Sequence, residues 1–198
     1  MQPFESITSS AVPLPVEHVD TDQIIPARFL KMVTKRGFGE HLFRDWRYQS
    51  DGEPNQDFVL NNPLFGGQIL VAGHNFGCGS SREHAAWALE QYGFRVIVSS
   101  AFADIFKNNA LNNGLLPIEV PPAFLHSTFE SIERDPATQF QVDLPRQQFT
   151  VLDTGATATF AIDPFKKDCL MRGMDELDFL LSLDPEITAF EQRQTVFS

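Results

Sequence analysis

The sequence predicts an α/β fold with C-terminal helices, and three patterns carry this prediction. A strand, a glycine-containing loop, a helix and a second strand follow one another between residues 68 and 98. Short strand-like runs lie between residues 139 and 162, and helical patterns close the chain between residues 176 and 194. Strands that alternate with helices favour a parallel sheet, whereas clustered short strands favour a meander.

The first third of the chain is rich in turn-forming residues. Acidic turn formers open residues 19–26, which end in a proline, and a short helical piece is expected at residues 28–31. Residues 37–39 contain two glycines that break this piece. Residues 40–48 resume with apolar side chains at helical spacing, which predicts a helix, and the polar residues 51–61 predict a surface loop.

The middle third carries the most regular pattern. Residues 68–72 contain a continuous apolar run that is typical of a buried strand. Residues 83–92 have alanine, tryptophan and leucine at helical spacing, and Gly93 suits a C-terminal cap. Residues 94–98 predict the next strand, and residues 102–109 predict a second short helix.

The last third changes to short strand-like runs followed by helices. The expected strands are residues 139–142, 148–152 and 157–162. The expected closing helices are residues 176–183 and 185–194, and the Asp184-Pro185 pair suits the start of the second.

Length and composition indicate one domain, residues 1–198, that binds neither nucleic acid nor a membrane. The 42% hydrophobic residues, with 19 phenylalanines, suffice for one core. The excess of 26 acidic over 15 basic residues repels polyanions. No segment approaches the ~20 apolar residues of a membrane span and the first residues show no targeting pattern, so a cytoplasmic location is expected.

The two cysteines, Cys78 and Cys169, limit the redox chemistry that the chain can support. They are too few for a disulfide framework and too few for the three or four thiolates that hold an iron–sulfur cluster. Cys78 lies between two glycines, and no histidine or carboxylate is obviously paired with it, so a small packed residue is favoured over a catalytic thiol.

Residues 77–84, Gly-Cys-Gly-Ser-Ser-Arg-Glu-His, are the strongest candidate for a functional site. Glycines allow a ligand to approach the backbone, the start of a helix offers unpaired N–H groups, and an arginine fork matches a carboxylate. A small carboxylic acid is therefore the first ligand to consider. Ser80 to Glu83 also fits a capping box that merely starts the helix, and sequence alone leaves both readings open. The signatures of dinucleotide loops, nucleotide phosphate loops and hydrolase elbows are absent.

At these residues the chain resembles the small subunits of 3-isopropylmalate dehydratase, a leucine-biosynthesis family of the aconitase superfamily. The resemblance covers nearly the whole chain. Four motifs in the same order carry it: DTDQIIP at residues 20–26, FGCGSSREH at 76–84, FADIF at 102–106 and GLLP at 114–117.

The resemblance implies a swivelling β/β/α domain with a mixed central sheet. It implies a hydro-lyase that interconverts 2-isopropylmalate and 3-isopropylmalate by dehydration and rehydration. It also implies that this chain binds no cofactor itself and that a [4Fe–4S] cluster belongs to a separate large subunit. The expected partners are that large subunit and a small dicarboxylate substrate.

The resemblance assigns roles to individual residues. Ser80 matches the catalytic base of the superfamily, and Ser81 and Arg82 match neighbours that hold the substrate and stabilise the alkoxide. Asp22 matches an acidic residue near the substrate, although an Asx turn before Ile24 explains it equally well.

Two basic residues and one histidine complete the set. Arg28 and Lys31 are candidates for carboxylate recognition or for lining the pocket of the isopropyl group, and the sequence does not decide which of them reaches the substrate. His84 is expected to be structural, because a histidine at a helix start is more often packed than a ligand.

Three rival functions stay open at this stage. A related split hydro-lyase could act on homoaconitate or methylmalate, since a few pocket atoms separate these substrates. A stand-alone serine enzyme would use Ser80 as a nucleophile, but no histidine and acid pair is evident. A binding module would sense a dicarboxylate without chemistry.

Overall fold

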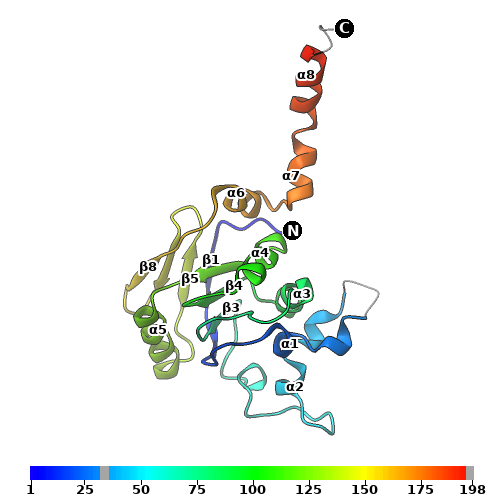
Figure 1. Ribbon diagram of the computed structural model, residues 1–198. Helices are drawn as coiled ribbons and strands as arrows, with labels where there is room; N and C mark the ends of the chain where they lie inside the picture. Colours follow the sequence, from blue (N-terminus) through cyan, green and yellow to red (C-terminus); the bar gives the residue numbers. More distant parts are fainter. Residues whose placement is uncertain (32–35, 195–198) are drawn as a thin grey trace.

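The computed structural model describes residues 1–31 and 36–194, which form two four-stranded sheets and surrounding helices (Figure 1). The strands are β1 (Ser6–Ser9), β2 (Ala11–Leu14), β3 (Ile69–Ala72), β4 (Val96–Ser99), β5 (Leu116–Glu119), β6 (Phe140–Asp143), β7 (Gln148–Val151) and β8 (Thr157–Thr159). The α-helices are α1 (Thr21–Ile24), α2 (Arg44–Arg47), α3 (Glu83–Tyr92), α4 (Asp104–Asn112), α5 (Pro122–Arg134), α6 (Pro164–Arg172), α7 (Glu176–Ser182) and α8 (Asp184–Gln194). The 3₁₀ helices are η1 (Ala27–Phe29), η2 (Phe38–His41) and η3 (Val59–Asn61).

The strands divide into a parallel sheet, β2-β3-β4-β5, and an antiparallel sheet, β1-β6-β7-β8. The α/β class is confirmed, but the expected mixed central sheet is replaced by two separate sheets. The reason lies in the connections: α3 and α4 link parallel neighbours, whereas short turns link β6, β7 and β8. Ser10, between β1 and β2, carries the chain from one sheet to the other.

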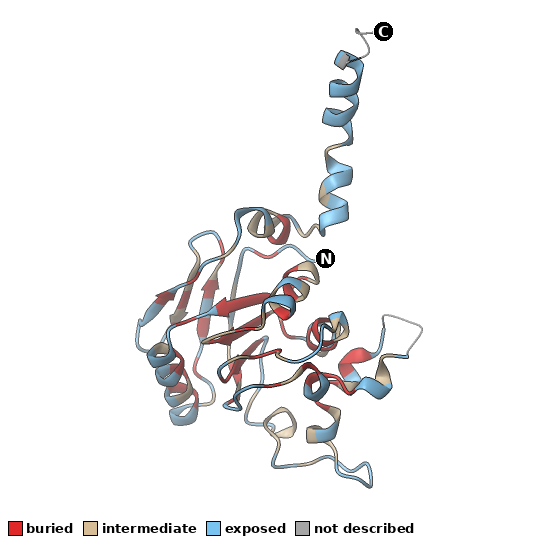
Figure 2. Cartoon of the chain, in the orientation of Figure 1, coloured by how far each residue is buried: buried red, intermediate tan, exposed pale blue. Residues whose placement is uncertain are grey.

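The parallel sheet lies between two hydrophobic clusters. Leu70 and Ala72 pack into a cluster with α1, η2, α3 and α4. Ile69 and Val71 point the other way, into a cluster with α5 and the antiparallel sheet. Because both faces are covered, all four residues of β3 are buried, as the red central strands in Figure 2 show.

Both edge strands of the parallel sheet contain a proline, and both were difficult to recognise from sequence. Pro13 lies in β2 and Pro117 in β5, at opposite ends of the strand order. Proline cannot donate to a ladder and is tolerated at an edge. The first fourteen residues, which sequence patterns left without strands, therefore supply one strand to each sheet.

Helix α3 has the bounds predicted from sequence, and Gly93 ends it in a left-handed conformation with φ of 117°. The single helix predicted at residues 40–48 is wrong, because η2 and α2 replace it. Phe43, between them, is left-handed with φ of 47°, and its amide donates to the carbonyl oxygen of Ile24 (2.8 Å). A tertiary hydrogen bond thus takes the place of a helical one.

The closing helices are confirmed as α7 and α8, which extend away from the sheets as an arm (Figure 1). Helices α5 and α6 were not predicted. In the described part of the chain, none of the helices has the length and apolar character needed to cross a bilayer.

Candidate active site

The candidate site is the loop that leaves β3 and enters α3. Gly77 and Gly79 have positive φ angles of 76° and 86°. A Cβ at Gly77 would lie 2.2 Å from the Phe106 ring, and one at Gly79 would lie 2.1 Å from a carboxylate oxygen of Asp20. Glycine is therefore required at both positions by conformation and by space.

The segment before α1 holds this loop in place through backbone hydrogen bonds. The amides of Gly77 and Cys78 donate to the carbonyl oxygen of Val19 (2.8 and 3.1 Å), and the amide of Thr21 donates to that of Cys78 (2.9 Å). The buried Thr21 hydroxyl donates to the carbonyl oxygen of Ser80 (2.8 Å). Two sequence motifs about sixty residues apart thus form one unit.

Thr21 was not singled out from sequence. Its only local signal is its place inside the first motif, and nothing in that motif indicates a hydrogen bond to residue 80.

The capping-box reading of Ser80 is wrong, because the N-cap of α3 is Arg82 and no side chain caps this helix. A capping box lies instead at the start of α1. The Asp20 side chain accepts from the backbone of Gln23, and the amide of Asp20 donates to the side-chain oxygen of Gln23 (2.8 Å). Ser80 and Ser81 are exposed. Within the described part of the chain, the amides of residues 79–82 donate no hydrogen bond to protein, so this loop is a nest of free donors.

Arg82 and Asp22, both expected at the site, form an ion pair across the two motifs. The Arg82 side chain is 15% exposed, and its Nη1 binds a carboxylate oxygen of Asp22 and the carbonyl oxygen of Ile25 (3.2 Å). Its Nε and Nη2 donate to none of the described residues. They remain available to a carboxylate.

The Asp22 carboxylate is stabilised in its charged form. The hydrogen bond from Arg82 lowers the pKa of Asp22 below its usual 3.8, against a smaller opposing effect of desolvation. The amide of Ala27 also donates to Asp22 (2.8 Å). The Asx contact that sequence suggested for Asp22 is made by Asp20, which accepts from the amide of Asp22 (2.6 Å).

Arg28 lies near this pair but is held by another residue. Both terminal nitrogens of Arg28 donate to the Asp45 carboxylate, Nη1 at 2.9 Å. Hydrogen bonding to Arg28 lowers the pKa of Asp45. Arg28 also lowers the pKa of Asp22 through its charge. Lys31 is exposed, and among residues 1–31 and 36–194 no contact joins it to these groups.

Asp45 is a site residue that sequence reasoning missed. It lies on α2, seventeen residues after Arg28, in a segment predicted to be a continuous helix.

His84 and Cys78 have structural surroundings. The ring of His84 lies against Trp87 (centroids 4.6 Å apart) and Phe38 (5.3 Å), and burial lowers the pKa of His84. The Cys78 thiol donates to the carbonyl oxygen of His18 (3.2 Å), and burial raises the pKa of Cys78. A raised pKa disfavours the thiolate, which is the nucleophilic form. In the described residues no histidine hydrogen-bonds Ser80, so the serine-hydrolase reading has no base.

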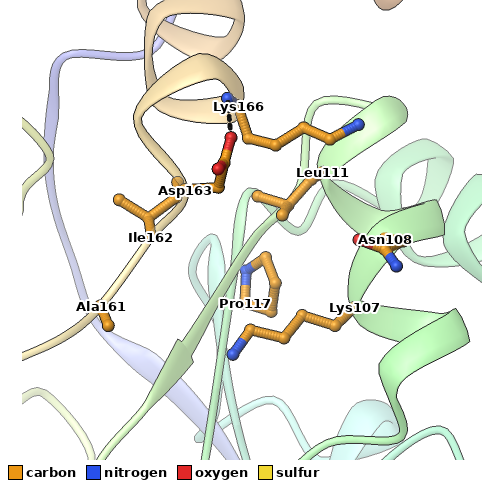
Figure 3. Close-up of a pocket in the computed structure, with 8 residues that line it drawn as sticks. All are labelled: Lys107, Asn108, Leu111, Pro117, Ala161, Ile162, Asp163 and Lys166. Atoms are coloured by element: carbon orange, nitrogen blue, oxygen red, sulfur yellow. Dashed lines mark hydrogen bonds between the residues drawn. The ribbon is translucent and has the colours of Figure 1, made fainter.

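A hollow of about 540 Å³ lies elsewhere, between α4, β5 and the start of α6 (Figure 3). Its lining residues are Lys107, Asn108, Leu111, Pro117, Ala161, Ile162, Asp163 and Lys166. Both lysines are already paired, Lys107 with Glu119 (3.4 Å) and Lys166 with Glu176. Neither lysine of the hollow is therefore left without a carboxylate partner, and the motif loop remains the best candidate. No group of three or more His, Cys, Asp or Glu side chains that could hold a metal ion occurs among the described residues.

Comparisons with known proteins agree with one another. The aconitase C-terminal domain family matches residues 1–123. The 3-isopropylmalate dehydratase small subunit of Cytophaga hutchinsonii is 56% identical over 198 residues, which are 100% of this chain and 98% of that protein. The corresponding subunit of Christiangramia forsetii is 55% identical over 194 residues, 98% of this chain and 95% of that protein.

A solved structure shows the same fold. The crystal structure of 3-isopropylmalate dehydratase from Methanocaldococcus jannaschii aligns with a TM-score of 0.67 at 24% identity, over 96% of this chain and 99% of that one. The fold expected from the sequence resemblance, an aconitase-type swivelling domain, is confirmed.

Proposed function

Because the chain belongs to the aconitase C-terminal domain family and, within it, to the small subunits of 3-isopropylmalate dehydratase, we propose that its motif loop supplies the base and the carboxylate-binding groups of that enzyme. The name of these relatives implies a large subunit as partner. We further propose that residues 1–198 act as one swivelling domain in the cytoplasm. In the reaction, a hydroxyl leaves one carbon and a proton leaves its neighbour, and water adds back to the alkene with the opposite orientation.

The observation that carries this proposal is the pairing of free donors with an exposed serine. Nε and Nη2 of Arg82 are free among the described residues, the amides of residues 79–82 are free, and Ser80 lies in the same loop. This arrangement suits a substrate carboxylate beside a serine oxygen that accepts the carbon-bound proton.

Serine is a weak base and needs a positive environment to lose its proton. Helix α3 has ten residues, and its N-terminal end carries a partial positive charge toward the loop. The Arg82 guanidinium and the free amides add donors on the same side. Together they favour the alkoxide of Ser80, and Ser81 hydrogen-bonds the substrate.

Asp22 and Arg28 have positioning and binding roles in this proposal. Asp22 fixes Nη1 of Arg82, so that the remaining nitrogens present a defined edge to the ligand. Arg28 remains a candidate for the distal carboxylate, although both of its terminal nitrogens already bind Asp45. Lys31 remains a candidate for the same task.

The exposed position of Ser80 and Ser81 supports the need for a partner. A carboxylate bound in open solvent gains little electrostatic free energy, because water screens the charges. The base also works best where water is excluded. A [4Fe–4S] cluster held by the large subunit would polarise the leaving hydroxyl. This chain would then close the site and handle the proton.

Reconstitution tests the proposal. The purified chain is mixed with the cluster-bearing large subunit, and conversion of 2-isopropylmalate is measured against the large subunit alone. The mixture is expected to turn over and the large subunit alone is not; equal rates contradict the proposal. Rates on the rival substrates homoaconitate and methylmalate, compared with the rate on 2-isopropylmalate, identify the preferred substrate.

A further inference from the structure

The arm formed by α7 and α8, residues 176–194, presents exposed apolar side chains, and we propose that it docks on the large subunit. This inference rests on the proposed function, because that function supplies the partner. Figure 1 shows both helices extending away from the sheets, with α8 farther out than α7. The motif loop and the arm would then contact the same protein.

The arm carries apolar side chains that none of the residues described by the structure covers. Five large hydrophobic residues lie on it with about half or more of their surface exposed: Leu177 (64%), Leu180 (57%), Leu181 (64%), Ile187 (47%) and Phe190 (56%). None of residues 176–193 is buried, as the pale blue helices in Figure 2 show. Helices of seven and eleven residues are marginal in water without tertiary packing, so this conformation is best explained by a docking surface.

The root of the arm is fixed to the body by specific contacts. Nζ of Lys166 binds the Glu176 carboxylate and Oδ1 of Asn112 (2.5 Å). The rings of Phe165 and Phe179 pack edge to face with centroids 4.8 Å apart. A capping box at Asp175 then starts α7. These contacts fix the direction in which the arm leaves the body of the protein, which lowers the entropy cost of docking.

The root also lies close to the motif helix. Nδ2 of Asn113 donates to the Glu83 carboxylate (3.2 Å), and Glu83 directly follows Arg82. Asn112, next to Asn113, binds the arm's root through Lys166. The end of α4 therefore joins the start of α3 to the base of the arm. A large subunit that covers Ser80 and Arg82 lies beside this base, so the arm continues the same interface.

Charge favours the large subunit over a second copy of this chain. Residues 175–194 contain six Asp or Glu residues and a single Arg. Two such arms packed together would bring like charges into contact, which is unfavourable. We therefore commit to an apolar groove on the large subunit that is bordered by Lys and Arg.

The experiment titrates the full-length chain into purified, cluster-loaded large subunit. The half-saturating concentration is read from turnover of 2-isopropylmalate and, independently, from complex formation in sedimentation velocity. The test variant is Leu180→Ser with Leu181→Ser, and a second variant is Phe190→Ser. The matched control is Leu64→Ser, because Leu64 is 67% exposed and lies before β3, outside the arm.

The arm variants are expected to raise the half-saturating concentration at least about tenfold, with turnover at saturation within about twofold of the wild type. The control should leave both values unchanged. Binding of the wild type should also weaken between about 0.05 and 0.5 M salt, because the charged rim is screened.

Two results would overturn the inference. One is an unchanged half-saturating concentration in both arm variants. The other is a wild-type chain that dimerises alone and becomes monomeric on substitution, with large-subunit binding unaffected, since the occupant is then a second copy. If the complex forms but no isopropylmalate is converted, the proposed function fails while sedimentation still decides whether the arm docks.

Discussion

Arg82 binds Asp22 through a single nitrogen, Nη1, and the same nitrogen donates to the carbonyl oxygen of Ile25 at 3.2 Å. Nε and Nη2 of Arg82 are thereby left for a ligand, and the contacts with Asp22 and Ile25 at α1 orient the guanidinium group. The two motifs of the chain meet at this contact, and the predictions below follow from it and from the loop around it.

Ser80→Ala should abolish most activity without affecting stability. Ser80 does not cap α3, and its hydroxyl donates to none of the described residues, so the free energy of unfolding should change by no more than about 0.5 kcal/mol. Turnover in the reconstituted enzyme should fall by ~10²-fold or more if Ser80 is the base. Ser127→Ala on α5, where the hydroxyl donates to the carbonyl oxygen of Phe124 within the same helix, is the control. Retained turnover in Ser80→Ala would remove Ser80 from the mechanism.

Arg82→Lys should weaken substrate binding although the charge is kept. A lysine ammonium cannot satisfy Asp22 and at the same time offer a planar pair of donors to a carboxylate. KM for 2-isopropylmalate should rise at least about tenfold, the loss expected for a charge-assisted hydrogen bond. Arg146→Lys, at a side chain that is 76% exposed in the antiparallel hairpin, should behave as the wild type. Equal KM values in both variants would contradict the assignment.

Asp22→Asn should cost stability at neutral pH but not in acid. The folded-state pKa of Asp22 is lowered, chiefly by the Arg82 hydrogen bond, so its contribution is present above the unfolded pKa near 3.8 and is lost as pH falls through the folded value. Urea unfolding of wild type and variant should therefore differ at pH 7 and converge at the acid end. The difference is expected to be small, because the Asp22 side chain is 55% exposed. A difference in the free energy of unfolding between wild type and variant that grows as the pH falls would contradict this role of the ion pair.

Gly79→Ala should be far more damaging than Gly155→Ala. Both glycines have positive φ, 86° and 70°, so each substitution carries the left-handed cost of about 1–2 kcal/mol. Only at Gly79 does the new Cβ also collide with Asp20, whereas Gly155 has open space. Thermal unfolding and turnover are measured for both variants. The Gly155 variant reports the conformational cost alone, and the additional loss in the Gly79 variant reports the collision with Asp20. Similar losses in both would show that Asp20 moves aside freely.

Local patterns were sufficient to predict the central strand, loop and helix. Apolar continuity in β3 and helical spacing in α3 depend only on neighbouring residues, and Gly93 marks the helix end by its own conformational freedom. The meander and the closing helices were found for the same reason.

The missed features depend on residues far apart in the chain. Phe43 adopts its left-handed conformation because Ile24 offers a hydrogen-bond acceptor, which no local pattern reveals. Asp45 contacts Arg28 in a structure where η2 and α2 are two separate helices, whereas the sequence predicted one continuous helix. A capping box was one of the two readings that the sequence left open for Ser80, and the structure has it at Asp20 instead. Contacts between residues 18–21 and 76–80, rather than the serine side chain, fix the start of α3.

The passage of the chain through Ser10 has a consequence for biosynthesis. β1 pairs with β6, which ends at Asp143, and β2 pairs with β3. During translation the first segment must therefore wait until nearly three quarters of the polypeptide has left the ribosome before its hydrogen bonds are complete. Such distant pairing slows folding and leaves strand edges open in the nascent protein.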